Sequence, residues 1–218
     1  MSGSGSDPKL TGAAFIVGMR AEARIARRLG MVGIGAVGIG ADSAETLAAD
    51  GAPALISFGI AGGLDPALPP GALVVPGAVV TLDGERFAAA PALIAALGGA
   101  TAKTLLGSPA IVGESTEKAR IFATTGAAAV DMESGAVARA AARHGIPFAV
   151  LRVIGDPAGR DLPPAAKAAF VPGGGIAVFA LIASLAAAPA QIPALFALAR
   201  ETRRALQGLQ DAARRLAR

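Results

Sequence analysis

Cysteine is absent from this 218-residue sequence, and histidine occurs once, as His144. Without cysteine the chain can form no disulfide, no thiolate metal site and no cysteine nucleophile. A single histidine cannot assemble a zinc site by itself, because such a site needs several nitrogen or sulfur ligands. The sequence therefore predicts a protein that holds no metal.

Tryptophan and tyrosine are also absent, and aromatic residues make up only 4% of the chain. Proteins that bind single-stranded nucleic acid stack bases on aromatic rings, and this chain has few rings to offer. The formal net charge is +4, with arginines concentrated in residues 24–28 and 200–218. We expect no nucleic-acid partner.

Charge of either sign is scarce, because charged residues make up 17% of the chain and hydrophobic residues 53%. This composition is typical of a closely packed sheet with helices, and 218 residues suffice for one good-sized core. Residues 1–11 include SGSGS, lack the pattern of a signal peptide and predict a flexible leader. We expect one α/β domain over residues 12–218 of a cytoplasmic protein.

Apolar runs of strand length alternate with helical patterns along most of the chain. The predicted strands are residues 13–18, 54–58, 72–80, 101–106 and 147–154. The predicted helices are residues 20–29, 46–49, 91–97, 114–123 and a helix that ends on Gly145. This alternation predicts a three-layer αβα fold, with a largely parallel mixed sheet covered by helices on both faces.

Residues 31–39 contain a formal GxGxxG at Gly33, Gly35 and Gly38. In dinucleotide-binding proteins this fingerprint occupies the turn between a strand and a helix. Here the glycines fall inside the apolar run, and the helix signal, the capping-box spacing of Asp42 and Glu45, comes later. We therefore expect the glycines to permit close backbone packing, with no nicotinamide or flavin cofactor.

The last part of the chain, residues 174–218, is predicted to be a helical extension. Residues 176–199 carry no charge and approach the length of a membrane span, but Pro189, Gln191 and Pro193 interrupt them, which favours two packed helices. Residues 200–218 are basic and amphipathic. Such a segment usually presents a solvated face, and contact with a membrane surface or a partner helix is the alternative.

Acidic side chains stand where predicted strands end. Val130 closes an apolar segment, and Asp131 and Glu133 follow at the mouth of a helix, where backbone N–H groups favour a carboxylate. The alternative interpretation is that both residues serve only as helix caps. Asp156 follows the next buried strand, directly before Pro157. We expect Glu133 and Asp156 to lie at the ends of neighbouring strands, and this placement favours a chemical role for Glu133 over a capping role.

The stretch after the strand at 54–58 reads GIAGGLDPALPPG and places Gly59, Gly62 and Gly63 at the strand's carboxyl end. Open α/β sheets bind ligands at such ends, and glycines let main-chain groups approach a small molecule. A plain glycine turn is the alternative.

Ser115-x-x-Lys118 formally matches the nucleophile motif of β-lactamases. The companion motifs of those enzymes are absent, and an exposed helix start explains the spacing better. We expect no covalent catalysis by Ser115.

Three pieces occur in order along the chain: Gly18-Met19-x-x-Glu22, residues 57–64 reading SFGIAGGL, and residues 130–134 reading VDMES followed by Gly155-Asp156. Together they resemble the nucleoside phosphorylase and nucleosidase superfamily that includes methylthioadenosine/S-adenosylhomocysteine nucleosidase. The wording SFGIAGGLDPAL, the IGDPAGR loop and the Pro- and Arg-rich tail look most like the hopanoid-associated nucleoside phosphorylases. Those proteins are thought to remove adenine from adenosylhopane.

The resemblance implies roles for the matching residues. Asp156 would be the general acid that protonates purine N7, Glu133 would bind the ribose hydroxyls, and Glu22 would help to activate an attacking water, as in hydrolytic members. The residues implied to contact the sugar or base or to line the pocket are Met132, Ile60, Ala61, Gly62, Ile111 and Val112. Weaker candidates for holding phosphate are Arg20 and Gly40. The relatives also imply a homodimer, with phosphate as co-substrate and no cofactor.

The chemistry is consistent with these assignments. Breaking a ribose–purine bond passes through an oxocarbenium-like ion, which requires an acid at the leaving base and acceptors near the sugar. Burial can raise the pKa of Asp156 for that purpose, and Glu133 can accept hydrogen bonds from two adjacent hydroxyls. Phosphorylases typically place an arginine just before the central glycine motif, where this chain has Ser57. A bound dianion normally needs such charged partners or helix-terminal N–H groups.

The sequence thus predicts an enzyme that cleaves the N-glycosidic bond of an adenosine-type nucleoside, with adenosylhopane as the expected substrate and phosphate as the acceptor. A purine nucleosidase that uses water is one alternative, supported by Glu22 and Ser57. A non-enzymatic nucleoside-binding or membrane-associated protein is another, suggested by the charge-free run and the basic tail.

Overall fold

A mixed sheet forms the centre of the computed structural model, which describes residues 10, 12–34, 40–171, 175–176 and 187–217. Nine strands belong to it: β1 (Ala14–Val17), β2 (Met31–Ile34), β3 (Leu55–Gly63), β4 (Leu73–Val74), β5 (Pro76–Thr81), β6 (Arg86–Ala88), β7 (Ala102–Gly107), β8 (Ala129–Asp131) and β9 (Phe148–Asp156). Two short strands form a separate antiparallel pair, β10 (Phe170–Val171) and β11 (Gly175–Ile176).

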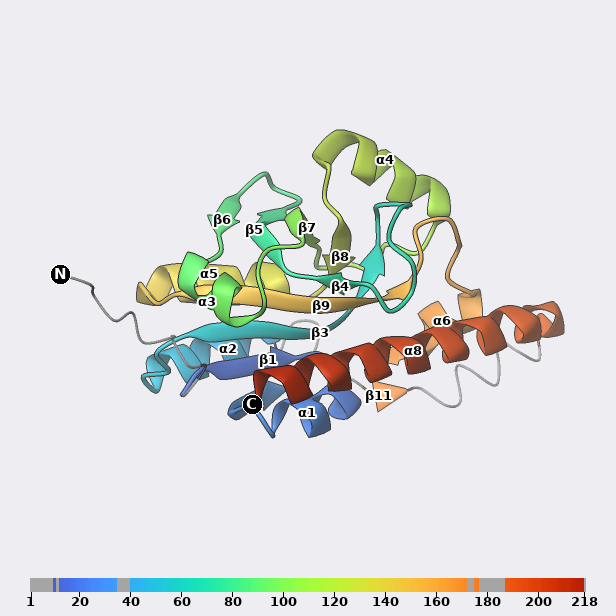
Figure 1. Cartoon of the computed structure of the whole chain (residues 1–218). Helices are drawn as coiled ribbons and strands as arrows, with labels where there is room; N and C mark the ends of the chain where they lie inside the picture. Colours follow the sequence, from blue (N-terminus) through green and yellow to red (C-terminus); the bar gives the residue numbers. More distant parts are fainter. Residues whose placement is uncertain (1–9, 11, 35–39, 172–174, 177–186, 218) are drawn as a thin grey trace.

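Helices cover both faces of this sheet (Figure 1). They are α1 (Arg20–Ala26), α2 (Gly40–Ala49), α3 (Pro91–Ala96), α4 (Ser115–Thr125), α5 (Ser134–His144), α6 (Pro164–Ala169) and α8 (Ile192–Leu216), with a 3-10 turn η1 (Pro189–Gln191) before the last. Both α4 and α5 end on a glycine with positive φ, at Gly126 and Gly145, a conformation that glycine adopts without steric cost.

The strand order is β2-β1-β3-β8-β7-β5-β6, with β9 beside β3 and β4 beside β9. Pairing is parallel for β1 with β2 and β3, for β3 with β9, and for β7 with β5 and β8. It is antiparallel for β3 with β8, β4 with β9 and β5 with β6. The predicted three-layer α/β fold with a largely parallel mixed sheet is confirmed.

One prediction about the sheet is wrong in detail. The strand that leads to Glu133 and the strand that ends at Asp156 are not neighbours, because β3 lies between β8 and β9. Gly62 of β3 pairs with Val130 on β8 and with Asp156 on β9. The glycine segment therefore separates the two acidic strand ends and holds them in register.

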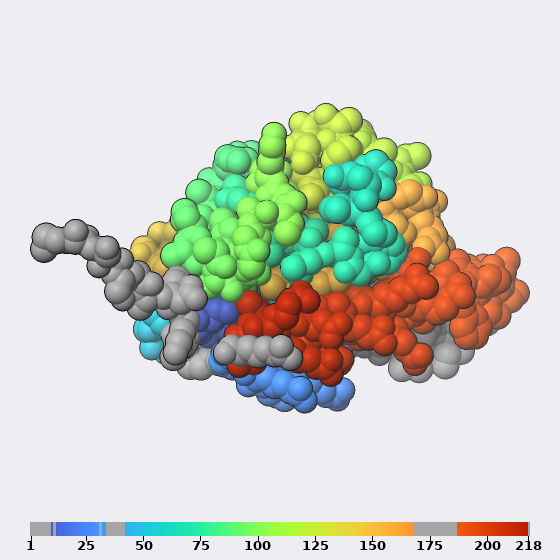
Figure 2. Space-filling model, in the orientation of Figure 1, coloured from blue at the N-terminus to red at the C-terminus, as the bar shows by residue number. Residues whose placement is uncertain are grey.

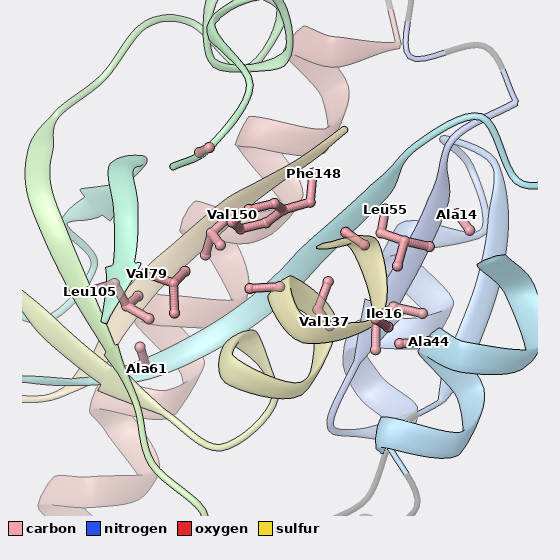
Figure 3. Close-up of a cluster of buried hydrophobic side chains, with 14 of the residues drawn as sticks. Ala14, Ile16, Ala44, Leu55, Ala61, Val79, Leu105, Val137, Phe148 and Val150 are labelled. Carbon is pink, nitrogen blue, oxygen red and sulfur yellow. The ribbon is translucent and has the colours of Figure 1, made fainter. Parts of the chain in front are cut away.

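The core lies on the two faces of β1, β3 and β9. On one face α2 and α5 pack against the sheet, with Val137 of α5 beside Ile16 and Leu55 (Figure 3). On the other face α1, α3 and α8 pack against side chains such as Phe15 and Phe58, whose rings meet edge to face at 5.7 Å. Burying these apolar surfaces drives the layers together.

The first part of the chain contains the predicted leader and the GxGxxG stretch. Leu10, which falls inside the predicted leader, packs against the core, and its carbonyl accepts a hydrogen bond from Ala13 N–H. Residues 1–9 and 11 lie outside the described residues. Gly33 and Ile34 of the GxGxxG stretch belong to β2, and its other residues lie outside the described ones; α2 begins at Gly40, ahead of the predicted capping pair.

The charge-free stretch 176–199 was predicted to form two packed helices, which stays a prediction because the first of them would fall largely on residues outside the described ones. Ile176 belongs to β11, residues 177–186 lie outside the described residues, and Ile192–Ala199 forms the beginning of the 25-residue helix α8. Pro193 falls in the first turn of α8, where a missing N–H costs no hydrogen bond. Within the described residues, no helix is long and apolar enough to cross a membrane.

Helix α8 runs along one side of the molecule (Figures 1 and 2). Its C-terminal half buries Ala205, Leu209 and Ala212 in the core, while Phe196 near its start is 69% exposed. The C-terminal half of α8, which belongs to the predicted amphipathic segment, therefore packs as part of the core of the fold.

Candidate active site

Glu22 occupies the third position of α1, directly after β1, and its side chain is buried. Its carboxylate accepts three backbone N–H bonds, from Gly18 at 2.9 Å, Met19 at 2.8 Å and Ile60 at 2.8 Å. The bond from the N-cap residue Met19 to Glu22 at the third position is one of the two bonds of a capping box. The Glu22 side chain therefore stabilises the start of α1 and also connects α1 to Ile60 on β3. Burial raises the pKa of Glu22, against the lowering effect of Arg152 and of these hydrogen bonds.

Two glycines make room for this cluster. A Cβ atom on Gly59 would lie 2.5 Å from Glu22 Oε1 and 2.6 Å from Arg152 Nη1. A Cβ atom on Gly18 would lie 2.5 Å from Glu133 Oε1. Since real Cβ atoms do not approach other atoms so closely, a side chain at Gly18 would displace the Glu133 carboxylate, and one at Gly59 would displace Glu22 and Arg152.

Arg152 is a fully buried cation in the middle of β9. Its Nε lies 2.5 Å from Asp131 Oδ2, and its Nη2 lies 3.0 Å from Glu133 Oε2 and 2.7 Å from Ser57 Oγ. Burial opposes the charge, but Asp131, Glu133 and Glu22 raise the pKa of the guanidinium. A buried cation of this kind needs several anionic partners to remain charged.

Asp131 supports the start of α5. Its Oδ1 accepts the backbone N–H of Ser134 at 3.0 Å, and its Oδ2 accepts the Ser134 hydroxyl. The Ser134 hydroxyl also lies 2.9 Å from Ser57 Oγ. The expectation that Asp131 helps to begin the helix is thus met, and the same carboxylate also anchors Arg152.

Glu133 is the N-cap residue of α5, yet its side chain makes no capping hydrogen bond. The carboxylate turns to Arg152 and keeps 13% of its side-chain surface accessible. Burial, opposed by Arg152 and assisted by the charges of Asp131 and Glu22, raises the pKa of Glu133 to about 7. A partly accessible carboxylate backed by a buried cation can accept hydrogen bonds from a ligand's hydroxyls.

Asp156 ends β9 and keeps 14% of its side-chain surface accessible. Burial raises its pKa, against the lowering effect of Lys118, whose Nζ lies 2.5 Å from Asp156 Oδ2. A Cβ atom on Gly62 would lie 3.8 Å from the same Oδ2. An acid with a raised pKa at a strand end suits proton transfer to a ligand.

The structure brings most of the predicted site residues to one end of β3. Glu22 and Glu133 share Arg152, while Ile60, Ala61 and Gly62 follow along β3 toward Asp156. The other predicted contact residues lie on the segments beside this strand end: half-buried Met132 between β8 and α5, and half-buried Ile111 and buried Val112 between β7 and α4.

The positions of three predicted site residues give little support to a role in ligand binding. Val112 packs in a small apolar cluster with Leu106 and Val130, which is a core role. Arg20 is exposed at the first position of α1, and Gly40 is the first residue of α2. A hollow of about 240 Å³ lies near Gly40, between β2 and α2, and its walls include Asp42 and Thr46 but none of the predicted site residues.

Two residues of this region were not predicted as site residues, although the sequence carries a signal for each. Arg152 is the one charged residue in the apolar run 147–154, and a charge inside a buried strand needs a buried partner. Lys118 stands in the Ser115-x-x-Lys118 spacing and proves to be fully buried. Their partners come from distant parts of the chain, so only the fold identifies them.

Metal ligation was predicted to be absent. In the described parts of the chain, no three histidine or acidic side chains are grouped as metal ligands. The expectation of a protein without metal or cofactor stays a prediction.

The family model of the phosphorylase superfamily matches residues 26–186. No curated protein sequence matches the chain closely enough to count as a relative.

Several solved structures share the fold. The 5'-methylthioadenosine/S-adenosylhomocysteine nucleosidase of Neisseria meningitidis, in complex with methylthio-immucillin-A, has a TM-score of 0.63 at 18% identity, covering 93% of this chain and 97% of its own. The S-adenosylhomocysteine nucleosidase of Streptococcus pyogenes has a TM-score of 0.64 at 17% identity, covering 97% and 98%. The futalosine hydrolase of Helicobacter pylori has a TM-score of 0.62 at 15% identity, covering 95% and 98%.

Proposed function

The chain belongs to the phosphorylase superfamily, and we propose that it cleaves the N-glycosidic bond of an adenosine-type nucleoside and releases adenine. The observation that carries this proposal is the pair of partly accessible acids, Glu133 and Asp156, on either side of Gly62. Solved structures with the same fold include nucleosidases for 5'-methylthioadenosine and S-adenosylhomocysteine and a futalosine hydrolase. Membership of this superfamily favours an enzyme over a non-enzymatic binding protein.

The two acids are suited to different tasks. Asp156, whose pKa is raised, gives a proton to N7 of the purine, so that the base leaves as a neutral molecule. Glu133, held by Arg152, accepts hydrogen bonds from the ribose hydroxyls and places negative charge near the oxocarbenium-like carbon. Different surroundings thus give two carboxyl groups two roles.

Water is the acceptor that the geometry supports best. The N–H groups of Gly18, Met19 and Ile60 converge beside Arg152 as donors for an anion, but the carboxylate of Glu22 already occupies them. A phosphate dianion would face that carboxylate at close range. A carboxyl with a raised pKa is, in contrast, a suitable base for a water nucleophile.

Phosphate remains the second candidate acceptor. The observation in its favour is the resemblance of residues 57–68 and 154–160 to the hopanoid-associated phosphorylases. The same resemblance supports a large apolar group at the 5′ position, as in adenosylhopane, and half-buried Ile60 adds apolar surface at the strand end.

The test is adenine release from adenosine, 5′-methylthioadenosine and an adenosine with a long apolar 5′ group, each with and without phosphate. A nucleosidase releases adenine and free sugar at the same rate in phosphate-free buffer. A phosphorylase stops without phosphate and makes a sugar 1-phosphate with it. A folded protein that frees no adenine from any of the three nucleosides contradicts the proposal.

A peripheral membrane contact is a separate proposal, based on the first half of α8. Ile192 is 44% and Phe196 69% exposed, and the exposed arginines Arg200, Arg203 and Arg204 follow on the same helix. Apolar and basic side chains together suit an anionic lipid surface. Co-sedimentation with anionic vesicles should fall for the double variant Ile192→Ser/Phe196→Ser, while unchanged co-sedimentation contradicts the contact.

The resemblance also implies a homodimer in the cytoplasm with no cofactor. Light scattering of the purified full chain tests the dimer, and activity after exhaustive dialysis against a chelator tests the absence of a metal.

A further inference from the structure

Lys118 of α4 is a buried cation that the proposed reaction has not yet used. Its side chain has no accessible surface, and its ammonium group makes three contacts. Nζ lies 2.5 Å from Asp156 Oδ2 and donates hydrogen bonds to the carbonyls of Pro157 at 3.1 Å and Arg160 at 2.9 Å. All three N–H donors of the ammonium are therefore occupied.

These contacts fix one oxygen of Asp156 and the loop that follows it. Since Oδ2 is taken by Lys118, the other oxygen, Oδ1, is left without a hydrogen-bond partner within the described residues. The carbonyl bonds to Pro157 and Arg160 hold the turn after β9 against α4. Among the described residues, Lys118 thus holds one oxygen of Asp156 and leaves the other available to a ligand.

We propose that Lys118 is the positioning residue of the proton donor: it directs Oδ1 of Asp156 toward the purine and stabilises the carboxylate that forms when the proton leaves. This inference rests on the proposed function. In the step, the O–H proton of Asp156 moves to N7, and the electrons of the bond between C1′ and N9 pass to the purine. The negative charge left on Asp156 then lies against the Lys118 ammonium. The proton that the attacking water loses restores Asp156 in the net reaction.

Other charged groups face the same carboxyl group. Arg160 lowers the pKa of Asp156 less than Lys118 does, and Asp161 raises it. Arg160 is itself paired with Glu201 of α8 across a narrow crevice that Asp156 also lines. Lys118 is the largest of the charged influences on Asp156, and burial is the only stronger effect.

The sign of the expected change follows from these contacts. Lys118 stabilises the ionised form of Asp156, so its removal raises the pKa of Asp156 further. Because the acid must be protonated to act, activity falls as pH rises through that pKa. The alkaline limb of the pH profile of kcat should therefore move to higher pH when Lys118 is replaced, although the rate below the limb falls because the donor is less well held.

The experiment compares Lys118→Met and Lys118→Arg with Lys103→Met, which replaces an exposed lysine on β7. For Lys118→Met we expect kcat to fall about tenfold or more with a small change in KM, and the alkaline limb to move up. Lys118→Arg should keep kcat and the pH of the alkaline limb close to those of the parent chain, because it retains the positive charge. Lys103→Met should have the same kcat and the same alkaline limb as the parent chain. A second readout, carbon-13 NMR titration of the Asp156 carboxyl assigned with Asp156→Asn, needs no activity.

The outcomes are distinct. An unmoved alkaline limb together with an unmoved Asp156 titration in folded Lys118→Met overturns the inference even if adenine is released. If the parent chain releases no adenine, the proposed function fails and the catalytic part of the inference fails with it, while the titration still decides whether Lys118 controls Asp156. If Lys118→Met does not fold, Lys118→Gln, which also removes the charge, supplies the same two readouts.

Discussion

Arg152 Nη2 lies 3.0 Å from Glu133 Oε2, and this contact links the middle of a buried strand to the mouth of helix α5. The same guanidinium lies 2.5 Å from Asp131 and faces Glu22. One buried cation therefore compensates three acids from separate parts of the chain. The stability of the fold and the ionisation of the candidate ribose-binding group depend on the same residue.

Replacing Arg152 by methionine should destabilise the protein in a pH-dependent way. The variant leaves Asp131, Glu133 and Glu22 without their cation, and breaking a buried charge pair typically costs about 3–5 kcal/mol. The loss should be larger at pH 8 than at pH 5.5, because the acids can take up protons at the lower pH. Urea unfolding at both pH values measures it, with the exposed Arg86→Met as control, and an equal loss at both pH values contradicts the explanation.

Glu133 should make stability fall as pH rises. Its pKa in the folded protein is about 7, above the value of 4.5 for a free glutamate. The contribution is fully present below about pH 4.5 and is lost as pH rises through about 7, by on the order of 3 kcal/mol. The free energy of unfolding of the parent chain minus that of Glu133→Gln, measured from pH 4.5 to pH 8, should decline. If this difference in the free energy of unfolding does not change with pH, the pKa of Glu133 is not raised in the folded protein.

The ionisation of Glu133 should also appear in catalysis. Only the carboxylate accepts hydrogen bonds from both ribose hydroxyls, so kcat/KM for adenine release should increase as pH rises through about 7. Glu133→Gln should lose most of its activity, and its remaining kcat/KM should no longer increase as pH rises through about 7. A parent enzyme with constant kcat/KM between pH 5.5 and 8 contradicts this role.

Asp156→Asn should lose adenine release by about 10²-fold or more, because the amide cannot give a proton to the leaving base. The exposed Asp50→Asn at the end of α2 is the matched control and should keep full activity. Adenine formation followed by chromatography measures both. Full activity of Asp156→Asn would remove Asp156 from the proposed mechanism.

Gly59→Ala should inactivate and destabilise the protein, because the added methyl group would lie 2.5 Å from Glu22 Oε1 and 2.6 Å from Arg152 Nη1. Gly159→Ala is the control, since its Cβ would meet nothing within 4 Å. Thermal unfolding and adenine release should both change for the first variant and neither for the second. A stable, active Gly59→Ala would mean that the cluster is looser than its distances indicate.

Local patterns in the sequence were sufficient for the elements and the sheet class. Apolar runs predicted β7, β9 and the first half of β3, and Gly145 ended α5 as expected. Such features depend on neighbours a few residues away. The predicted end of the strand at residue 58 is wrong, because β3 continues through Gly59, Gly62 and Gly63, which pair with β9 and β8 as part of the sheet. The predicted helical extension is described mainly at α8, whose register against the sheet depends on which of its turns bury apolar side chains there, and the local sequence does not fix that.

The sequence by itself predicted Glu22, Glu133 and Asp156 as candidate site residues, since each follows or begins an element whose limits are local. It could not determine how those acids are charged. Ion pairs form between residues far apart in the chain, such as Lys118 with Asp156 and Arg152 with Asp131. Only the tertiary structure brings these groups together and removes water from around them, and the pKa of a carboxyl depends on both.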